Sequence, residues 1–149
     1  MKRIALLAFV ALVALPACGG DDDDPARTPA GMAQVRLLED LYDGRFAQAY
    51  ADLHPSHQTI VSRRLFVRCA QESIPVGELD SIEILDVYDE EAKGVVLSGA
   101  PTKAVEIRLT FTDGETDGPF VNHEVNVDDR WRWVLNQRAI DAYQAGRCP

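Results

Sequence analysis

The sequence is poor in cysteine, in basic residues and in long apolar runs, and each scarcity excludes a class of protein. It has three cysteines in 149 residues, and 15 lysine and arginine residues against 24 acidic ones. An acidic chain is repelled by phosphates and anionic lipid headgroups, which argues against nucleic-acid binding and against a basic membrane-surface contact. The longest apolar run covers residues 4–15 and is shorter than the about 20 residues of a membrane-spanning helix.

Motifs of common enzyme and metal sites are also missing. No serine lies in a Gly-x-Ser-x-Gly turn, and there is no glycine-rich phosphate loop. His54 and His57 lie around Pro55, which prevents them from sharing one helical face, so we interpret them as a helix end. The acidic residues at 113, 115 and 117 lack the spacing of a calcium loop and fit a hairpin turn. The sequence therefore indicates no metal, no cofactor and no catalytic residue.

The N-terminus has the pattern of an export signal. Lys2 and Arg3 precede the apolar run, which closes with Leu15-Pro16-Ala17-Cys18. This ending resembles the lipobox of bacterial lipoproteins, in which an aliphatic residue lies three positions before the cleavage point and a cysteine follows it. The resemblance implies cleavage between Ala17 and Cys18 and attachment of acyl chains such as palmitate to Cys18. The alternative is an ordinary signal peptide cut after Ala17, which leaves Cys18 a plain thiol.

These features divide the chain into three parts. Residues 1–17 are expected to be a lipoprotein signal peptide, residues 18–31 a lipidated cysteine with a disordered acidic tether, and residues 32–149 a single domain. The tether contains Asp21 to Asp24 and no large apolar side chain, and a flexible run of this kind lacks the convergent ligands of a calcium site. Loss of residues 1–17 changes the formal net charge from −9 to −11.

The lipid anchor predicts an extracytoplasmic, membrane-attached domain. Several acyl chains hold a protein on a bilayer without any contact by the domain itself. In a host with two membranes we expect the outer one, since Gly19 replaces the aspartate associated with inner-membrane retention. In such a compartment Cys69 and Cys148 are expected to form a disulfide. The alternative is a buried thiol at Cys69 and a free thiol on the C-terminal tail.

The first part of the domain has helical periodicity. Apolar residues recur at three- and four-residue steps from Thr28 to Tyr42, from Phe46 to Leu53, and after Ser62. Thr28 and Ser62 are suited to cap helix N-termini, with Pro29 at a first helical position. We expect Asp43-Gly44 to stop the first helix and His54-Pro55 the second.

After Pro75 the period changes to that of strands. Runs at residues 82–88, 105–111, 121–127 and 131–135 favour β-structure, residues 113–118 and 128–129 form turns, and residues 95–97 could form a short strand or loop. A last helix begins near Gln137. Helices followed by an antiparallel meander of about four strands predict an α+β fold in which the helices cover one face of a curved sheet.

This layout resembles the nuclear transport factor 2-like superfamily, the cone-shaped α+β fold shared with ketosteroid isomerases. The resemblance lies in the segment from Gly44 to Tyr50, in His54-Pro55, and in the tryptophan-rich strand Asp129 to Trp133. It implies a conical cavity between the helices and the sheet. The alternative architecture is another helix-and-sheet fold of the cystatin type.

If the cavity is open, inward-facing residues of the strands and helices would line it. The expected lining residues are Tyr42, Tyr50, Ile107, Leu109, Val121, His123 and Val125. His123 is a single imidazole among valines with no acid paired to it, which favours a place at the edge of the core. Trp131 and Trp133 are expected to pack in the core.

The sequence therefore favours a non-catalytic lipoprotein domain that binds a small apolar ligand or an envelope protein. A proton-transferring isomerase or dehydratase that uses the cavity is the alternative, and a structural or regulatory accessory module is a third reading. Whether the chain is an enzyme stays open at this point.

Replacing Cys18 with serine tests the anchor. Because serine cannot accept the thioether-linked lipid, the Cys18→Ser variant is expected to appear in the soluble extracytoplasmic fraction. The measurement is cell fractionation followed by immunoblotting, with the unmodified chain in the membrane fraction as control. A variant that stays with the membrane would count against lipid anchoring.

Overall fold

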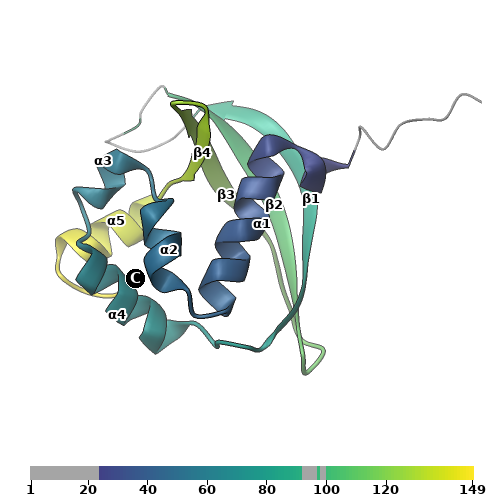
Figure 1. Ribbon diagram of the computed structural model, residues 1–149, viewed down its shortest axis with the longest axis horizontal. Coiled ribbons are helices and arrows are strands. Elements are labelled where there is room, and N and C mark those ends of the chain that lie inside the picture. The colour runs from purple at the N-terminus through teal and green to yellow at the C-terminus, as the bar shows by residue number, and fades with distance from the viewer. Residues whose placement is uncertain (1–23, 92–96, 98–99) are drawn as a thin grey trace, which may run out of the picture.

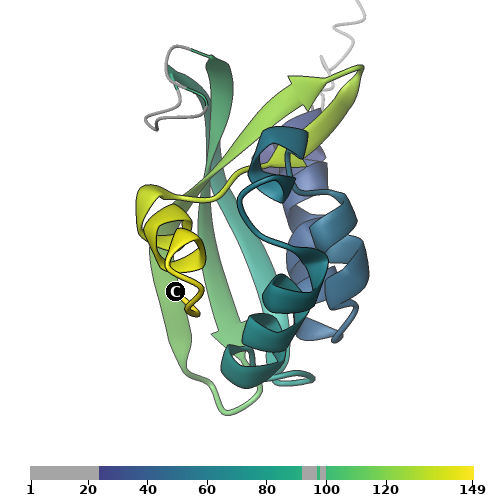
Figure 2. The same cartoon turned by 90° about the vertical axis from the view of Figure 1, so that its left-hand side faces the viewer.

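A four-stranded antiparallel sheet and the helices packed against it make up the fold (Figures 1 and 2). The computed structural model describes residues 24–91, 97 and 100–149. The expected signal peptide, the acylation site at Cys18 and the residues at 95 and 96 lie outside the described residues. Within the described part, the α+β class expected from the sequence is confirmed.

The sheet is a simple meander in the order β1-β2-β3-β4. Its strands are β1 (Leu79–Glu91), β2 (Pro101–Phe111), β3 (Thr116–Val127) and β4 (Arg130–Trp133). Asp128 and Asp129 join β3 to β4 with φ angles of 50° and 61°, the left-handed conformation that a two-residue type I′ turn requires. The expected hairpin at residues 113–118 is confirmed, although β3 already begins at Thr116.

Six helical segments were found in the described chain. They are the 3₁₀ helix η2 (Pro25–Arg27), α1 (Pro29–Tyr42), α2 (Phe46–Ala51), α3 (Pro55–Gln58), α4 (Arg63–Ser73) and α5 (Gln137–Gln144). The expected caps of α1 and α4 are confirmed, because the hydroxyl groups of Thr28 and Ser62 accept hydrogen bonds from Gly31 N–H and Leu65 N–H. The single turn α3 was not expected.

The helices and the sheet enclose two apolar clusters. One lies between α1 and the sheet and includes Leu38, Ile84, Val105, Ile107 and Leu109. The other joins α2, α4 and α5, with Phe46, Leu53, Phe66, Ile140 and Tyr143 among its buried members. Each cluster has aromatic residues at its edge, and Trp131 of β4 packs against the first while Trp133 packs against the second. The short strand β4 therefore connects the two clusters.

The folded part begins earlier than expected. Residues 25–31, assigned from the sequence to the tether, form η2 and the first turn of α1, and Ala30 is buried. Small side chains explain the difference, because Ala26 and Ala30 fit against the apolar cluster of the sheet without a large residue. The buried face of α1 also includes Ala33, Gln34 and Leu37, whereas Met32 is 48% exposed.

The C-terminus is tied to α4 by a disulfide. Cys69 and Cys148 are joined with an S–S distance of 2.05 Å, as expected from the sequence. None of the helices in the described ranges is long and apolar enough to cross a bilayer.

Removing this disulfide is expected to destabilise the domain. The bond closes a loop with a sequence separation of 79 residues, and the chain-entropy model gives about 4 kcal/mol for a loop of this size. The double variant Cys69→Ser, Cys148→Ser is expected to unfold at lower urea concentration than the oxidised chain. The reduced wild-type chain is the control and should behave like the variant, and equal midpoints for all three would contradict the prediction.

Candidate functional site

A cavity of about 450 Å³ lies between α1, the end of α2 and the β3–β4 hairpin. From α1 it is lined by Pro29, Met32, Ala33, Arg36 and Leu37. From the remaining elements it is lined by Asp52, Glu124, Asp129, Arg130, Trp131 and Trp133. The arginines and Asp129 are exposed, whereas Glu124 is buried, so the charged rim surrounds a buried acid.

Glu124 is the most unusual residue of the site. Its side chain is 1% exposed, and neither carboxylate oxygen has a hydrogen-bond partner among the described residues. Its pKa is raised to about 8, mainly by burial and also by the nearby Asp52, while Arg36 acts in the opposite direction. A carboxyl group with a pKa in this range exchanges its proton near neutral pH.

The register of the sheet puts Glu124 on the cavity side. Glu124 of β3 is paired with Trp133 of β4, and directly paired residues project their side chains to the same face of a sheet. Along β3, Phe120 and Asn122 share that face, because they are paired with Ile107 and Val105 of the core. Phe120, Asn122 and Glu124 therefore face the helices.

A second buried polar residue lies on α1. Gln34 is fully buried, and its amide nitrogen and oxygen have no hydrogen-bond partner within residues 24–91, 97 and 100–149. Buried polar groups without partners are rare in folded proteins and concentrate at functional sites. The stripe of apolar residues that predicted α1 did not include Gln34, so sequence reasoning missed it.

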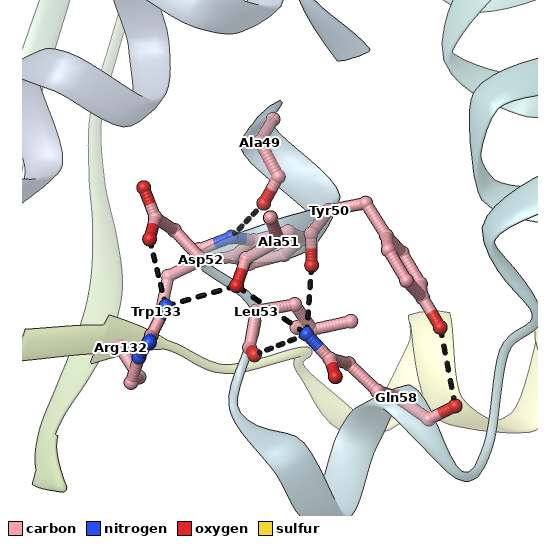
Figure 3. A network of polar contacts seen from close by, with 8 residues as sticks. All are labelled: Ala49, Tyr50, Ala51, Asp52, Leu53, Gln58, Arg132 and Trp133. Carbon is pink, nitrogen blue, oxygen red and sulfur yellow. Dashed lines mark hydrogen bonds and ion pairs between the residues drawn. The ribbon is translucent and has the colours of Figure 1, made fainter. Parts of the chain in front are cut away.

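Polar contacts connect the end of α2 to Arg132 and Trp133 of β4 (Figure 3). Trp133 Nε1 donates a hydrogen bond to the carbonyl oxygen of Ala49 at 2.8 Å, and its ring centroid lies 5.7 Å from that of Phe66. Arg132 Nη1 donates to the Ala51 carbonyl at 2.9 Å and forms an ion pair with Asp52 at 2.7 Å. Trp133 and Asp52 thus have fixed positions, and Asp52 already has a cationic partner.

Gln58 completes the same network from α3. Its Nε2 donates to the carbonyl oxygens of Tyr50 and Leu53, both at 3.0 Å. The Tyr50 hydroxyl in turn donates to the carbonyl oxygens of Gln58 and Val61. The bond to Tyr50 serves a carbonyl group in the last turn of α2, and the others connect the segment after α2 to α3 and the residues that follow it.

The two histidines near α3 bind backbone groups. His54 Nδ1 accepts a hydrogen bond from Ser56 N–H, and His57 Nδ1 accepts one from Leu135 N–H at 2.8 Å. Burial lowers the pKa of His57 to about 4, so its ring is neutral at pH 7. In the part of the chain that the structure describes, no three metal-ligating side chains lie close enough together to hold a metal ion.

None of the residues expected to line a cavity lines this one. Ile107 and Leu109 are buried in the core beneath α1. The ring of Tyr42 packs 5.8 Å from Phe111, and the Tyr50 hydroxyl is bonded to backbone carbonyl groups. The helical tyrosines thus serve the packing of the helices.

The expected inward residues of β3 do not line the cavity. Val121 is 40% exposed and paired with Glu106, His123 Nε2 lies 2.7 Å from Glu90 Oε2, and Val125 is paired with Arg132. The valines are expected inward because apolar side chains of a strand usually face the core. Val121 is exposed and departs from this rule, whereas Val125 is buried (8% exposed) without lining the cavity, and Glu124 takes the position at the cavity.

The fold and cavity define a class, an α+β domain in which helices cover an antiparallel meander and a buried acid faces a small cavity. Comparison of the chain with family models, with curated proteins and with solved structures found no match. The cavity and its lining residues are therefore the basis of the proposed function.

Glu124→Gln is expected to stabilise the free protein in a pH-dependent way. Glu124 has a pKa of about 8 in the folded state and an ordinary value of 4.5. Below about pH 4.5 Glu124 is protonated in both the folded and the unfolded state, and the stabilising contribution of its bound proton is complete. As the pH rises from 4.5 toward 8 the unfolded state loses this proton first, so the free energy of unfolding falls. Glutamine does not ionise, so the variant should gain on the order of 3–5 kcal/mol relative to wild type between these pH values.

The measurement is urea unfolding at pH 4.5, 6, 7 and 8.5. Glu106→Gln is the matched control, since it removes a half-buried carboxylate from the opposite face of the sheet. A gain for Glu124→Gln that is the same at every pH would contradict the assignment of a buried, ionisable acid.

Proposed function

We propose that the protein is a lipid-anchored extracytoplasmic lipoprotein whose domain binds a small molecule in the cavity beside Glu124. The observation that carries this proposal is the buried carboxyl group without a partner among the described residues, facing a cavity of about 450 Å³. A buried, unsatisfied polar group costs about 1–3 kcal/mol or more, and a residue that served only the core would be apolar. A ligand that bonds to Glu124 would offset this cost.

The anchor and the fold assignment support the same picture. The ending Leu15 to Cys18 is typical of a lipoprotein signal, and the disulfide between Cys69 and Cys148 fits an oxidising compartment. The order of helices and a four-stranded meander supports the nuclear transport factor 2-like assignment, in which a cavity between helices and sheet binds ligands. The domain could instead bind an envelope protein, but a cavity of about 450 Å³ favours a small molecule.

A proton-transferring isomerase or dehydratase is the second candidate, and the pKa of Glu124 favours it. An acid with a pKa of about 8 is suited to act as a general base or acid near neutral pH. Such enzymes also need a group that stabilises the developing negative charge. His123 and Tyr50 could supply such a group, but His123 is paired with Glu90 and the Tyr50 hydroxyl is bonded to backbone carbonyl groups. Binding without reaction is therefore the leading proposal.

Ligand binding can be measured through the protein's own fluorescence. The chain has two tryptophans, and both line the cavity. A library of small molecules is screened against the mature chain carrying Cys18→Ser, by tryptophan fluorescence and by the shift in Tm. Compounds that bind in the cavity are expected to change both signals.

The variant Ala33→Leu locates the binding site, because it adds three carbon atoms at the cavity wall. We expect it to weaken binding at least tenfold, which corresponds to about 1.4 kcal/mol. The matched control Ala47→Leu makes the same change on α2, away from the cavity. Ligands that bind both variants equally well would place binding elsewhere and contradict the proposal, and conversion of a bound ligand that Glu124→Gln abolishes would favour the enzyme.

A further inference from the structure

We propose that the ligand carries a protonated amine, and that Glu124 together with the rings of Trp131 and Trp133 binds this cationic head. The inference rests on the proposed function, because it names the chemical class of the ligand that the cavity accepts. Three features of the cavity support it: the charge balance at its buried end, the aromatic walls, and the mixed charge of its rim.

Among the described residues no cationic side chain bonds to Glu124, and Lys103, its cross-strand neighbour on β2, is paired with Asp89. Asp52 lies near Glu124, but its carboxylate is already paired with Arg132. Arg36 is the cation whose field reaches Glu124, and it lies on an exposed position of α1. Because the pKa of Glu124 stays raised in spite of Arg36, the charge of Arg36 does not offset the cost of burying the ionised carboxylate. An ammonium group would supply the missing charge and donate hydrogen bonds of the strong, charge-assisted kind.

An anionic ligand fits this end of the cavity poorly. Glu124, with a pKa of about 8, is largely neutral at about pH 7.5, so the repulsion would come from the carboxylate of Asp52, and an anion would also disfavour ionisation of Glu124. A neutral, apolar ligand would leave both oxygens of Glu124 without the hydrogen bonds that they also lack among the described residues. A cationic ligand would avoid the repulsion and would donate hydrogen bonds to the oxygens of Glu124.

Two indole rings provide the walls for such a cation. Trp131 and Trp133 both line the cavity, and the hydrogen bond from Trp133 Nε1 to Ala49 fixes one ring before any ligand arrives. Tryptophan is the best aromatic partner for an ammonium group, worth about 0.5–2 kcal/mol per contact depending on exposure. A carboxylate beside preorganised aromatic rings is a suitable environment for an amine head.

The rim does not oppose this selection. Arg36 and Arg130 lie there together with Asp129, and all three are exposed. Exposed charges of mixed sign are screened by water and salt, so they contribute little to the choice of ligand charge. The buried Glu124 therefore determines the preferred head group.

The test compares three probes of similar shape and different charge: 2-phenylethylamine, 2-phenylethanol and 3-phenylpropionate. Each is titrated at pH 7.5 into the mature chain carrying Cys18→Ser with its disulfide intact, and tryptophan fluorescence is followed. The amine is expected to bind at least tenfold more tightly than either other probe. Glu124→Gln is expected to remove this preference, whereas Glu106→Gln should retain it.

A second measurement needs no variant at position 124. If the amine pairs with ionised Glu124, binding at pH 7 should release a proton, which calorimetry in buffers of different ionisation enthalpy detects. Equal or tighter binding of the alcohol or the carboxylate would overturn the amine assignment while leaving small-molecule binding in the cavity intact. Failure of all three probes, or no proton release, would also overturn it, and the Ala33→Leu screen would then decide separately whether the cavity binds any ligand.

Discussion

The capping of one short helix by side chains from distant parts of the chain holds this structure together around its cavity. Helix α2 has only six residues, so most of its carbonyl groups have no partner within the helix. Arg132 and Trp133 of β4 and Gln58 of α3 supply the missing donors (Figure 3). Because these bonds connect α2 to the last strand, they fix the hairpin against the helices and set the width of the cavity between them.

The same arrangement explains how the fold accepts a buried acid. Position 124 is opposite Trp133, so its side chain must project toward the helices once Trp133 is bonded to α2. The domain tolerates the free-energy cost of burying Glu124 because it has two apolar clusters and a disulfide whose loop contains all four strands and the last helix. A domain stabilised in this way can retain a destabilising residue that serves binding.

Much of the fold could be predicted from local patterns. Thr28 and Ser62 each initiate a helix through a single hydroxyl group, and Asp128-Asp129 forces a two-residue turn, so these boundaries depend only on neighbouring residues. Cys69 and Cys148 are the two cysteines left once Cys18 is assigned to the lipid, and they form the expected disulfide. The boundary at residue 32 was wrong, because small residues such as Ala30 can be buried without any apolar signal in the sequence.

The sequence by itself determined the α+β class, most helix boundaries, the two hairpin turns and the cysteine pair, because each depends on short-range periodicity, capping, turn chemistry or a count. Only the tertiary structure decided which face of β3 is inward, that Glu124 and Gln34 are buried, and that both tryptophans line a cavity. The physical reason is that alternation in a strand defines two faces but does not say which one the helices cover. That choice follows from the pairing of Glu124 with Trp133 and from the bond between Trp133 and α2, both of which join residues far apart in the chain.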